Sequence, residues 1–143
     1  MTRKDLILDK NTTIDSDLNC GNIRGKNGMI YNLKVNGNID AADITAGNIV
    51  ADNIDAGNIK AKNIDAIYVH AGWVNAENIK VADIIATNIK AKNIRYYSVC
   101  IAHGNIVCDT IKGADDKAVQ LALHGTITTK HKTSQRAKES DII

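Results

Sequence analysis

The chain has 143 residues, which is enough for one domain but short for two, and it contains no Phe, no Pro and a single Trp. Any core must therefore be built from Ile, Val, Leu and Ala, which suits thin and repetitive layers. Acidic and basic residues are interspersed and the formal net charge is only +2, so the composition does not indicate a nucleic-acid-binding protein with a strongly basic face.

No apolar run approaches the roughly 18 residues of a membrane span, and the N-terminus lacks the apolar stretch of a secretion signal. The three cysteines, Cys20, Cys100 and Cys108, are odd in number and irregularly spaced. That pattern favours reduced, partly buried thiols over a disulfide framework. We therefore expect a soluble protein of the cytoplasm that binds neither nucleic acid nor a membrane.

The first segment of the chain is only loosely periodic. Leu6 and Leu8 alternate with polar neighbours and predict an opening strand that covers the first coil of a repeat structure. Further aliphatic residues then recur at spacings of three to seven: Ile14, Leu18, Ile23, Ile30 and Leu33. We expect irregular N-terminal coils over residues 11–36.

A regular block at residues 37–101 decides the fold prediction, because an aliphatic residue recurs there at every fifth position through thirteen consecutive units. These residues are Ile39, Ile44, Ile49, Ile54, Ile59, Ile64, Val69, Val74, Ile79, Ile84, Ile89, Ile94 and Val99. Ala usually follows two positions later and Asn or Asp usually precedes, with Tyr68, Trp73 and Ser98 as exceptions. A period of five fits neither an amphipathic helix nor long strict alternation, so a helix is rejected.

Within one unit, the Ile-x-Ala step places both side chains on the same side of an extended segment, so both can point inward. The remaining Asn and Gly are expected to turn the chain, because they tolerate the positive φ of tight corners. Four such walls would close a square of about 20 residues per coil, with Ile39, Ile59, Ile79 and Val99 stacked at the usual strand spacing. The prediction is an all-β, right-handed parallel β-helix with a quadrilateral cross-section and capped ends.

These units resemble the pentapeptide-repeat family, whose members form right-handed quadrilateral β-helices from units of the kind Ala-(Asp/Asn)-Leu-x-x. The resemblance covers about half of the chain and brings no catalytic motif. The order differs here, because the large residue precedes the small one, as in Asn53-Ile54-Asp55-Ala56. The chain also resembles uncharacterised bacterial proteins rich in Asn-Ile-x-Ala runs that end in Tyr-Tyr-x-Val-Cys, here residues 96–100.

After Cys100 the phase slips, since Gly104 stands where an aliphatic residue is due and Ile106 resumes two positions late. We expect the solenoid to occupy residues 1–112. Alternating Val119, Leu121 and Leu123, followed by a His-Gly turn, predict a capping hairpin at 113–129 that hides the last edge. Residues 130–143 are polar, charged and aperiodic, which predicts a flexible tail.

Residues with reactive or metal-binding side chains do not form a recognisable site. Cys100, His103, Cys108 and His124 are of types that zinc accepts, but their spacing matches no zinc pattern. Catalysis needs a nucleophile with its base or paired carboxylates in a cleft, and a smooth solenoid supplies neither. We expect no enzyme activity, no metal and no cofactor.

Three large residues, Ile67, Tyr68 and Trp73, replace the usual polar residues and are predicted to face outward as a partner-binding site. The alternative is that the aromatic rings lie flat against the corners. Charge is also uneven, with five acidic and two basic residues between 40 and 65 but two acidic and four basic residues between 77 and 95. This dipole favours a weak, antiparallel, salt-sensitive homodimer.

The sequence therefore predicts a non-enzymatic structural or interaction scaffold that binds a protein partner or a second copy of itself. The alternative is an inhibitor or protector of a type II topoisomerase that mimics DNA, as the family resemblance allows. Such mimicry needs a strongly acidic rod. Between Gly37 and Cys100 seven acidic residues stand against six basic ones, which disfavours the alternative.

Overall fold

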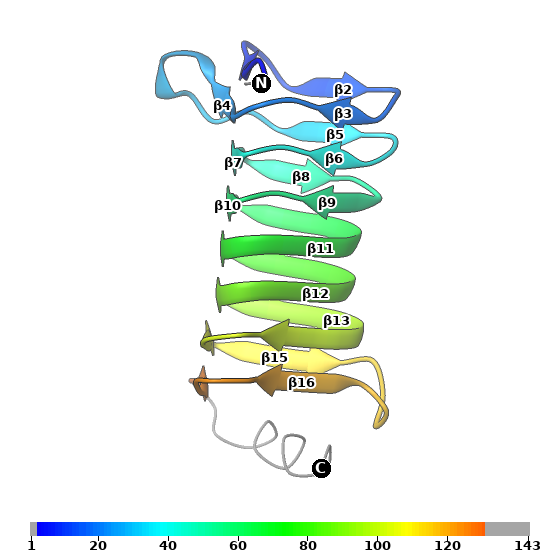
Figure 1. Ribbon diagram of the computed structural model, residues 1–143, viewed down its shortest axis with the longest axis vertical. Helices are drawn as coiled ribbons and strands as arrows, with labels where there is room; N and C mark the ends of the chain where they lie inside the picture. The colour runs from blue at the N-terminus through cyan, green and yellow to red at the C-terminus, as the bar shows by residue number, and fades with distance from the viewer. Residues whose placement is uncertain (1–2, 131–143) are drawn as a thin grey trace.

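The structure, a computed structural model, describes residues 3–130, so the predicted flexible tail lies outside the described residues except for Lys130. Parallel strands wind into a solenoid of about seven turns, and Figure 1 shows the chain descending from coil to coil along one axis. The predicted all-β parallel solenoid is confirmed. Among the residues described, no helix combines the length and hydropathy that a membrane crossing requires.

The coils of the regular block are shorter than predicted. Ile39 pairs with Ile54, and Ile54 pairs with Val69, so each coil advances by fifteen residues. Three five-residue units therefore complete one coil, and the strands form three ladders, which we call walls A, B and C.

Each wall is a stack of parallel strand segments that succeed one another along the axis. Wall A comprises β3 (Leu18–Asn19), β6 (Ile39–Asp40), β9 (Asn53–Asp55), the middles of β11 (Asn63–Asn75) and β12 (Asn78–Lys90), the end of β13 (Asn93–Ala102) and β16 (Val119–Ala122). Wall B comprises β1 (Leu6–Leu8), β4 (Ile23–Gly25), β7 (Asp43–Thr45), β10 (Asn58–Lys60), the ends of β11 and β12, β14 (Ile106–Cys108) and β17 (Ile127–Thr129). Wall C comprises β2 (Thr12–Ile14), β5 (Leu33–Val35), β8 (Asn48–Val50), the starts of β11, β12 and β13, and β15 (Thr110–Gly113).

The backbone conformation at the corners differs from the prediction. Positive φ angles occur, within the described part, only at Asn27, Gly28 and Gly37, so the corners of the later coils use no left-handed residue. Strands β11 and β12 run unbroken through thirteen residues each, and the small buried residues at their corners are Ala66 and Ala71 in β11 and Val81 and Ala86 in β12. The expectation that Asn and Gly turn the chain through positive φ was therefore wrong for the regular block, and so was the twenty-residue stacking of Ile39 on Ile59.

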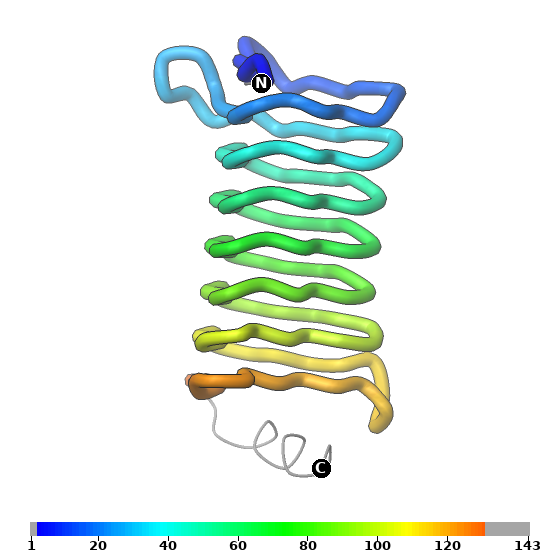
Figure 2. Tube along the Cα trace, in the orientation of Figure 1, coloured from blue at the N-terminus to red at the C-terminus, as the bar shows by residue number. Residues whose placement is uncertain are grey.

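Longer coils occur toward the two ends. Thr12 pairs with Leu33, twenty-one residues on, and Val99 pairs with Val119, twenty residues on. The extra residues form protrusions, which Figure 2 shows beside the first coils and below the last. The first of them contains a short 3-10 turn, Lys26–Gly28.

The predicted capping hairpin at 113–129 does not form. β16 pairs in parallel with β13, and β17 pairs in parallel with β14, so both strands continue the walls as a last coil. The sequence cue was misleading because an outward-facing wall strand alternates in the same way as a hairpin strand. The solenoid thus extends beyond the predicted boundary at residue 112. The opening strand β1 is present and pairs with β4.

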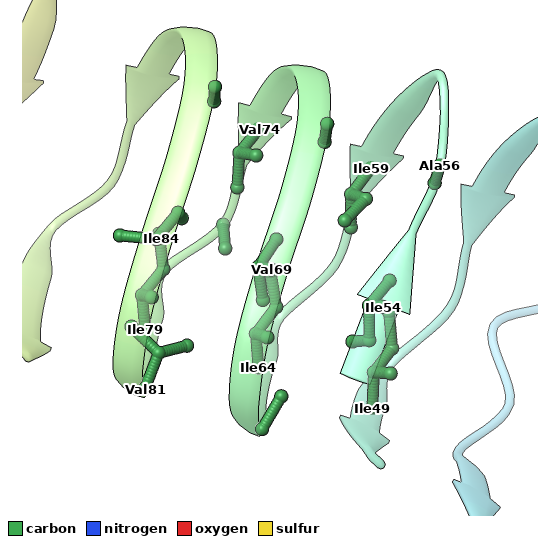
Figure 3. Packing of buried hydrophobic residues seen from close by; sticks show 14 of the residues in the cluster. Ile49, Ile54, Ala56, Ile59, Ile64, Val69, Val74, Ile79, Val81 and Ile84 are labelled. Carbon is green, nitrogen blue, oxygen red and sulfur yellow. The ribbon is translucent and has the colours of Figure 1, made fainter. Parts of the chain in front are cut away.

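The core is a column of aliphatic side chains along the axis. Every inward Ile or Val from 39 to 94 is buried, and the alanines two positions later fill the corners. Figure 3 shows Ile54, Val69 and Ile84 at equivalent places in successive coils. Burial of one such side chain contributes about 2 kcal/mol, and each coil covers the apolar faces of its neighbours.

A bulge in β13 ends the strict period. Val81 pairs with Tyr96 but Asp83 pairs with Val99, so β13 carries one extra residue at this corner. Val99 consequently faces outward, and Cys100 takes the inward place that the five-residue period assigned to Val99. The extra residue also pushes Tyr97 out of the corner, where it is 66% exposed.

Asparagine side chains form a ladder along wall C. The Nδ2 group of Asn63 donates to Oδ1 of Asn48 at 2.7 Å, and Asn78 and Asn93 each donate in the same way to the preceding rung at 2.8 Å. The Thr110 hydroxyl closes the run on Asn93 at 2.7 Å. Asn thus precedes the inward residue because its amide links successive coils. We call Asn48, Asn63, Asn78, Asn93 and Thr110 the amide ladder.

Replacing Ile64 by Asp places an uncompensated charge in a dry layer of the core, where its side chain is 1% exposed. We expect a loss of about 3–5 kcal/mol in the free energy of unfolding, or no folded protein. The neighbouring Asp65→Asn is the control and should change stability by less than about 0.5 kcal/mol. Urea unfolding followed by circular dichroism checks both, and equal effects would mean that the inward and outward positions are exchanged.

Replacing Asn78 by Ala removes one donated and one accepted hydrogen bond from the amide ladder. We expect a loss of about 1 kcal/mol, since exposed hydrogen bonds contribute modestly. Asn75→Ala, an outward position of wall B that is not part of the ladder, is the matched control. If both variants melt at the same temperature, the ladder does not hold the coils together.

Candidate functional site

The outward side of wall A becomes apolar in its C-terminal half. Two residues flank each inward residue and point outward, so each wall carries two rows of exposed side chains. Pairing between strands stacks Tyr68, Asp83, Val99 and Val119 in one row and His70, Ile85, Ile101 and Leu121 in the other. We call the six apolar members of these two rows the apolar face: Tyr68, Ile85, Val99, Ile101, Val119 and Leu121. All six are half-buried by their neighbours along the wall.

Strand β16 reverses the usual pattern of a half-buried strand. Val119 and Leu121 face outward, whereas Gln120 points into the solenoid and is 3% exposed. The Tyr96 hydroxyl donates a hydrogen bond of 2.8 Å to Oε1 of Gln120, so the buried amide is paired. Burial raises the pKa of the Tyr96 phenol, with a smaller effect of Cys100, and keeps this donor protonated. A strand that places its polar residue inside and its apolar residues outside favours a second apolar surface against the wall.

Asp83 lies within the apolar face. One oxygen of its carboxylate is buried and has no hydrogen-bond partner, which is costly for a charged group. The residue stacks between Tyr68 and Val99, and neither neighbour has a side-chain amide that could donate to its carboxylate. A covering surface that brings a hydrogen-bond donor would satisfy this oxygen.

The three residues predicted from sequence as a partner site do not lie on one wall. Tyr68 belongs to the apolar face, Ile67 lies beside it at the corner from wall C, and Trp73 lies on wall B between Asn58 and Asn88. Ile67 and Trp73 are 57% and 58% exposed. Sequence reasoning missed the other five members of the apolar face. The signal was present, because Ile85, Ile101 and Leu121 occupy the position that Asp, Lys or Asn holds in most other units.

Wall C carries a second distinctive surface beside the amide ladder. Lys80, Arg95 and Lys112 stack in register on successive strands. A shallow groove of about 590 Å³ runs between this row and Asn63, Asn78, Asn93 and Thr110, and Asp65, next to Lys80 in the row, also lines it. We call it the cationic groove. A smaller hollow of about 250 Å³ continues it over Val81 and Tyr96 to the exposed Tyr97.

The buried thiols are poor nucleophiles. Burial is the main cause that raises the pKa of Cys20 and Cys100, and it raises the pKa of Cys108 to about 11 with help from the Asp109 carboxylate. Over residues 3–130 no three His, Cys, Asp or Glu side chains cluster as a metal site would require. A histidine–carboxylate contact, from His70 Nδ1 to Asp55 Oδ1, is 3.5 Å long and exposed on wall A.

None of the protein-family models, curated proteins or solved structures that were compared with this chain matches it. The structure itself places the chain in a class, the parallel repeat β-solenoids with Asn-rich strands fifteen residues apart. The outer surfaces of the three walls therefore carry the evidence on function.

Thiol labelling tests the inward assignment of the cysteines. We expect a thiol reagent at neutral pH to leave Cys20, Cys100 and Cys108 unmodified in the native protein, because all three are buried and protonated. All three should react in denaturant, which is the internal control, and mass spectrometry counts the adducts. Rapid labelling of native Cys100 would mean that Val99, and not Cys100, points into the core.

Proposed function

We propose that the protein is a non-enzymatic scaffold that binds protein through the apolar face of wall A. The observation that carries this proposal is the reversal in β16, where Val119 and Leu121 face outward while Gln120 is buried. A contiguous apolar sheet surface in water favours coverage by another sheet or helix. The unpartnered oxygen of Asp83 supports a covering surface that also carries a donor.

The occupant that we propose is a second copy of the chain, packed wall A against wall A in antiparallel order. Nearer the N-terminus wall A is acidic, with Asp40 stacked on Asp55. Antiparallel pairing about the apolar face sets the acidic strands of each copy beyond the last wall A strand of the other, so the carboxylates of the two copies lie far apart. Parallel pairing would set the same carboxylates against each other, which is repulsive.

A two-fold axis that reverses the direction of the solenoid lies along the strands, so each row of one copy faces the same row of the other. With this axis between the wall A segments of β12 and β13, Tyr68 lies opposite Val119 and Ile85 lies opposite Ile101. A two-fold pair closes on itself and so avoids fibres. Among the residues predicted from sequence, Tyr68 takes part directly, Ile67 lies at the rim, and Trp73 lies outside the contact.

Membership of the pentapeptide-repeat family is also a proposal, supported by the five-residue unit and weakened by the three-walled coil. The DNA-mimic alternative receives little support from the surfaces. A DNA mimic needs long acidic rows, whereas the row of wall A that contains Asp40 and Asp55 continues into His70 and Ile85. Wall C carries the cationic groove instead.

Two lysine substitutions in the same coil test the proposed surface. Ile101→Lys places a charge in the apolar face, whereas Val107→Lys places the same charge at the equivalent outward position of wall B. We expect sedimentation to show a dimer for the wild type and for Val107→Lys, and a folded monomer for Ile101→Lys. A monomeric wild type at all concentrations contradicts a second copy as the occupant.

Position-specific cross-linking tests the antiparallel order. A mixture of Tyr68→Cys and Val119→Cys proteins should form a cross-linked dimer on oxidation, while neither variant does so alone. Cross-linking of Tyr68→Cys by itself would indicate a parallel pair. Loss of the dimer in Trp73→Ser but not in Ile101→Lys would place the contact on wall B.

A further inference from the structure

The cationic groove stacks cations that two other surfaces of the solenoid keep apart. On wall B, Lys60 and Lys90 occupy the equivalent outward row, and Asn75 separates them. At the corner between walls B and C, Lys62, Glu77, Lys92 and Asp109 follow one another through backbone hydrogen bonds, so the signs alternate. Lys92 and Glu77 form a salt bridge of 3.6 Å there. Stacked cations are thus avoided on these two surfaces.

On wall C the same position holds three consecutive cations. Lys80, Arg95 and Lys112 lie on neighbouring strands, about 4.8 Å apart along the axis, and directly opposed like charges destabilise a sheet. None of the three forms a salt bridge to a carboxylate within residues 3–130, although Asp65 is the next residue of the row. The other stack of like charges, Asp40 on Asp55, includes a salt bridge of 2.8 Å from Arg3 to Asp40. A stack of like charges that lacks such a partner indicates a functional site.

We propose that the cationic groove binds a linear polysaccharide of acidic sugars, with the polymer aligned along the solenoid axis. The row of Lys80, Arg95 and Lys112 repeats at the strand spacing, which is close to the advance of one sugar unit in an extended polymer. Each cation can then meet a carboxylate of the chain, and Arg95 can do so through two parallel hydrogen bonds. This proposal is independent of the contact proposed on wall A.

The other edge of the groove suits sugar hydroxyls. Asn63, Asn78 and Asn93 each use one N–H of the Nδ2 group to reach the preceding rung of the amide ladder. An amide nitrogen carries two such donors, so a regular row of donors remains opposite the cations. Because hydrogen bonds between the rungs already hold these side chains in place, little side-chain freedom is lost when a ligand binds.

Tyr97 supplies an aromatic platform beside the groove, on the side of the cation row away from the amide ladder. The bulge in β13 pushes this ring out of the corner next to Arg95 and Lys112. An exposed aromatic face packs against the apolar C–H face of a sugar ring. A single-stranded nucleic acid would instead need several stacking platforms along the groove, and one tyrosine provides only one.

Binding of polygalacturonate to the purified protein tests this proposal, with neutral dextran as the comparison polymer. We expect polygalacturonate, and not dextran, to retard the protein in affinity electrophoresis at low ionic strength. Lys80→Gln/Arg95→Gln should weaken binding at least about tenfold. Lys60→Gln/Lys90→Gln removes the same charge from wall B and should leave binding unchanged.

Two outcomes overturn the proposal. Equal loss of binding in the two double variants would mean that net charge and not the groove attracts the polymer.

Tyr97→Ala separates sugar recognition from simple anion binding, because it should weaken polygalacturonate binding by up to about tenfold and leave polyphosphate binding unchanged. Polyphosphate that binds as tightly as polygalacturonate, together with a silent Tyr97→Ala, rejects the acidic-sugar assignment.

Discussion

The stacking of each coil on the next at a fixed offset is the constraint on which every other feature depends. An isolated coil buries too few side chains to offset its loss of chain entropy, so each coil needs neighbours above and below. The aliphatic column supplies the stabilisation inside, and the amide ladder fixes the register on wall C. Because the offset is fifteen residues in the regular block and longer in the coils after it, residues at that interval become a continuous row on the outer surface.

Stacking of the coils brings residues that are far apart in sequence into continuous rows, and these rows form the binding surfaces. Ile85, Ile101 and Leu121 are far apart in sequence but form one apolar row, and Lys80, Arg95 and Lys112 form one cationic row on a different wall. The bulge in β13 serves both, because it turns Val99 outward on wall A and exposes Tyr97 beside wall C. Irregular positions in a regular solenoid are therefore where surface chemistry changes.

The five-residue period was sufficient to predict an all-β parallel solenoid with inward Ile and Ala, because burial of a regular aliphatic column has few alternatives. It was not sufficient to predict the number of walls. Three or four units per coil place the same side chains inward, and only the bending of strands such as β11 through their alanine corners decides between them. The outward rows depend on that number, so the apolar face and the cationic groove could not be assembled from sequence. The bulge that puts Cys100 instead of Val99 at the inward position depends on local strand pairing and could not be predicted from the sequence either.

Contacts between backbone amides across neighbouring coils test the central claim most directly, since the walls and both surfaces follow from the offset. In a nuclear Overhauser spectrum of labelled protein, protons of Ile64 and Asp65 should give cross-peaks to residues 78–80 on one side and 48–50 on the other. Such contacts at an interval of fifteen are the result that this account predicts. Cross-peaks from Ile64 to Ile84, at an interval of twenty, would contradict it.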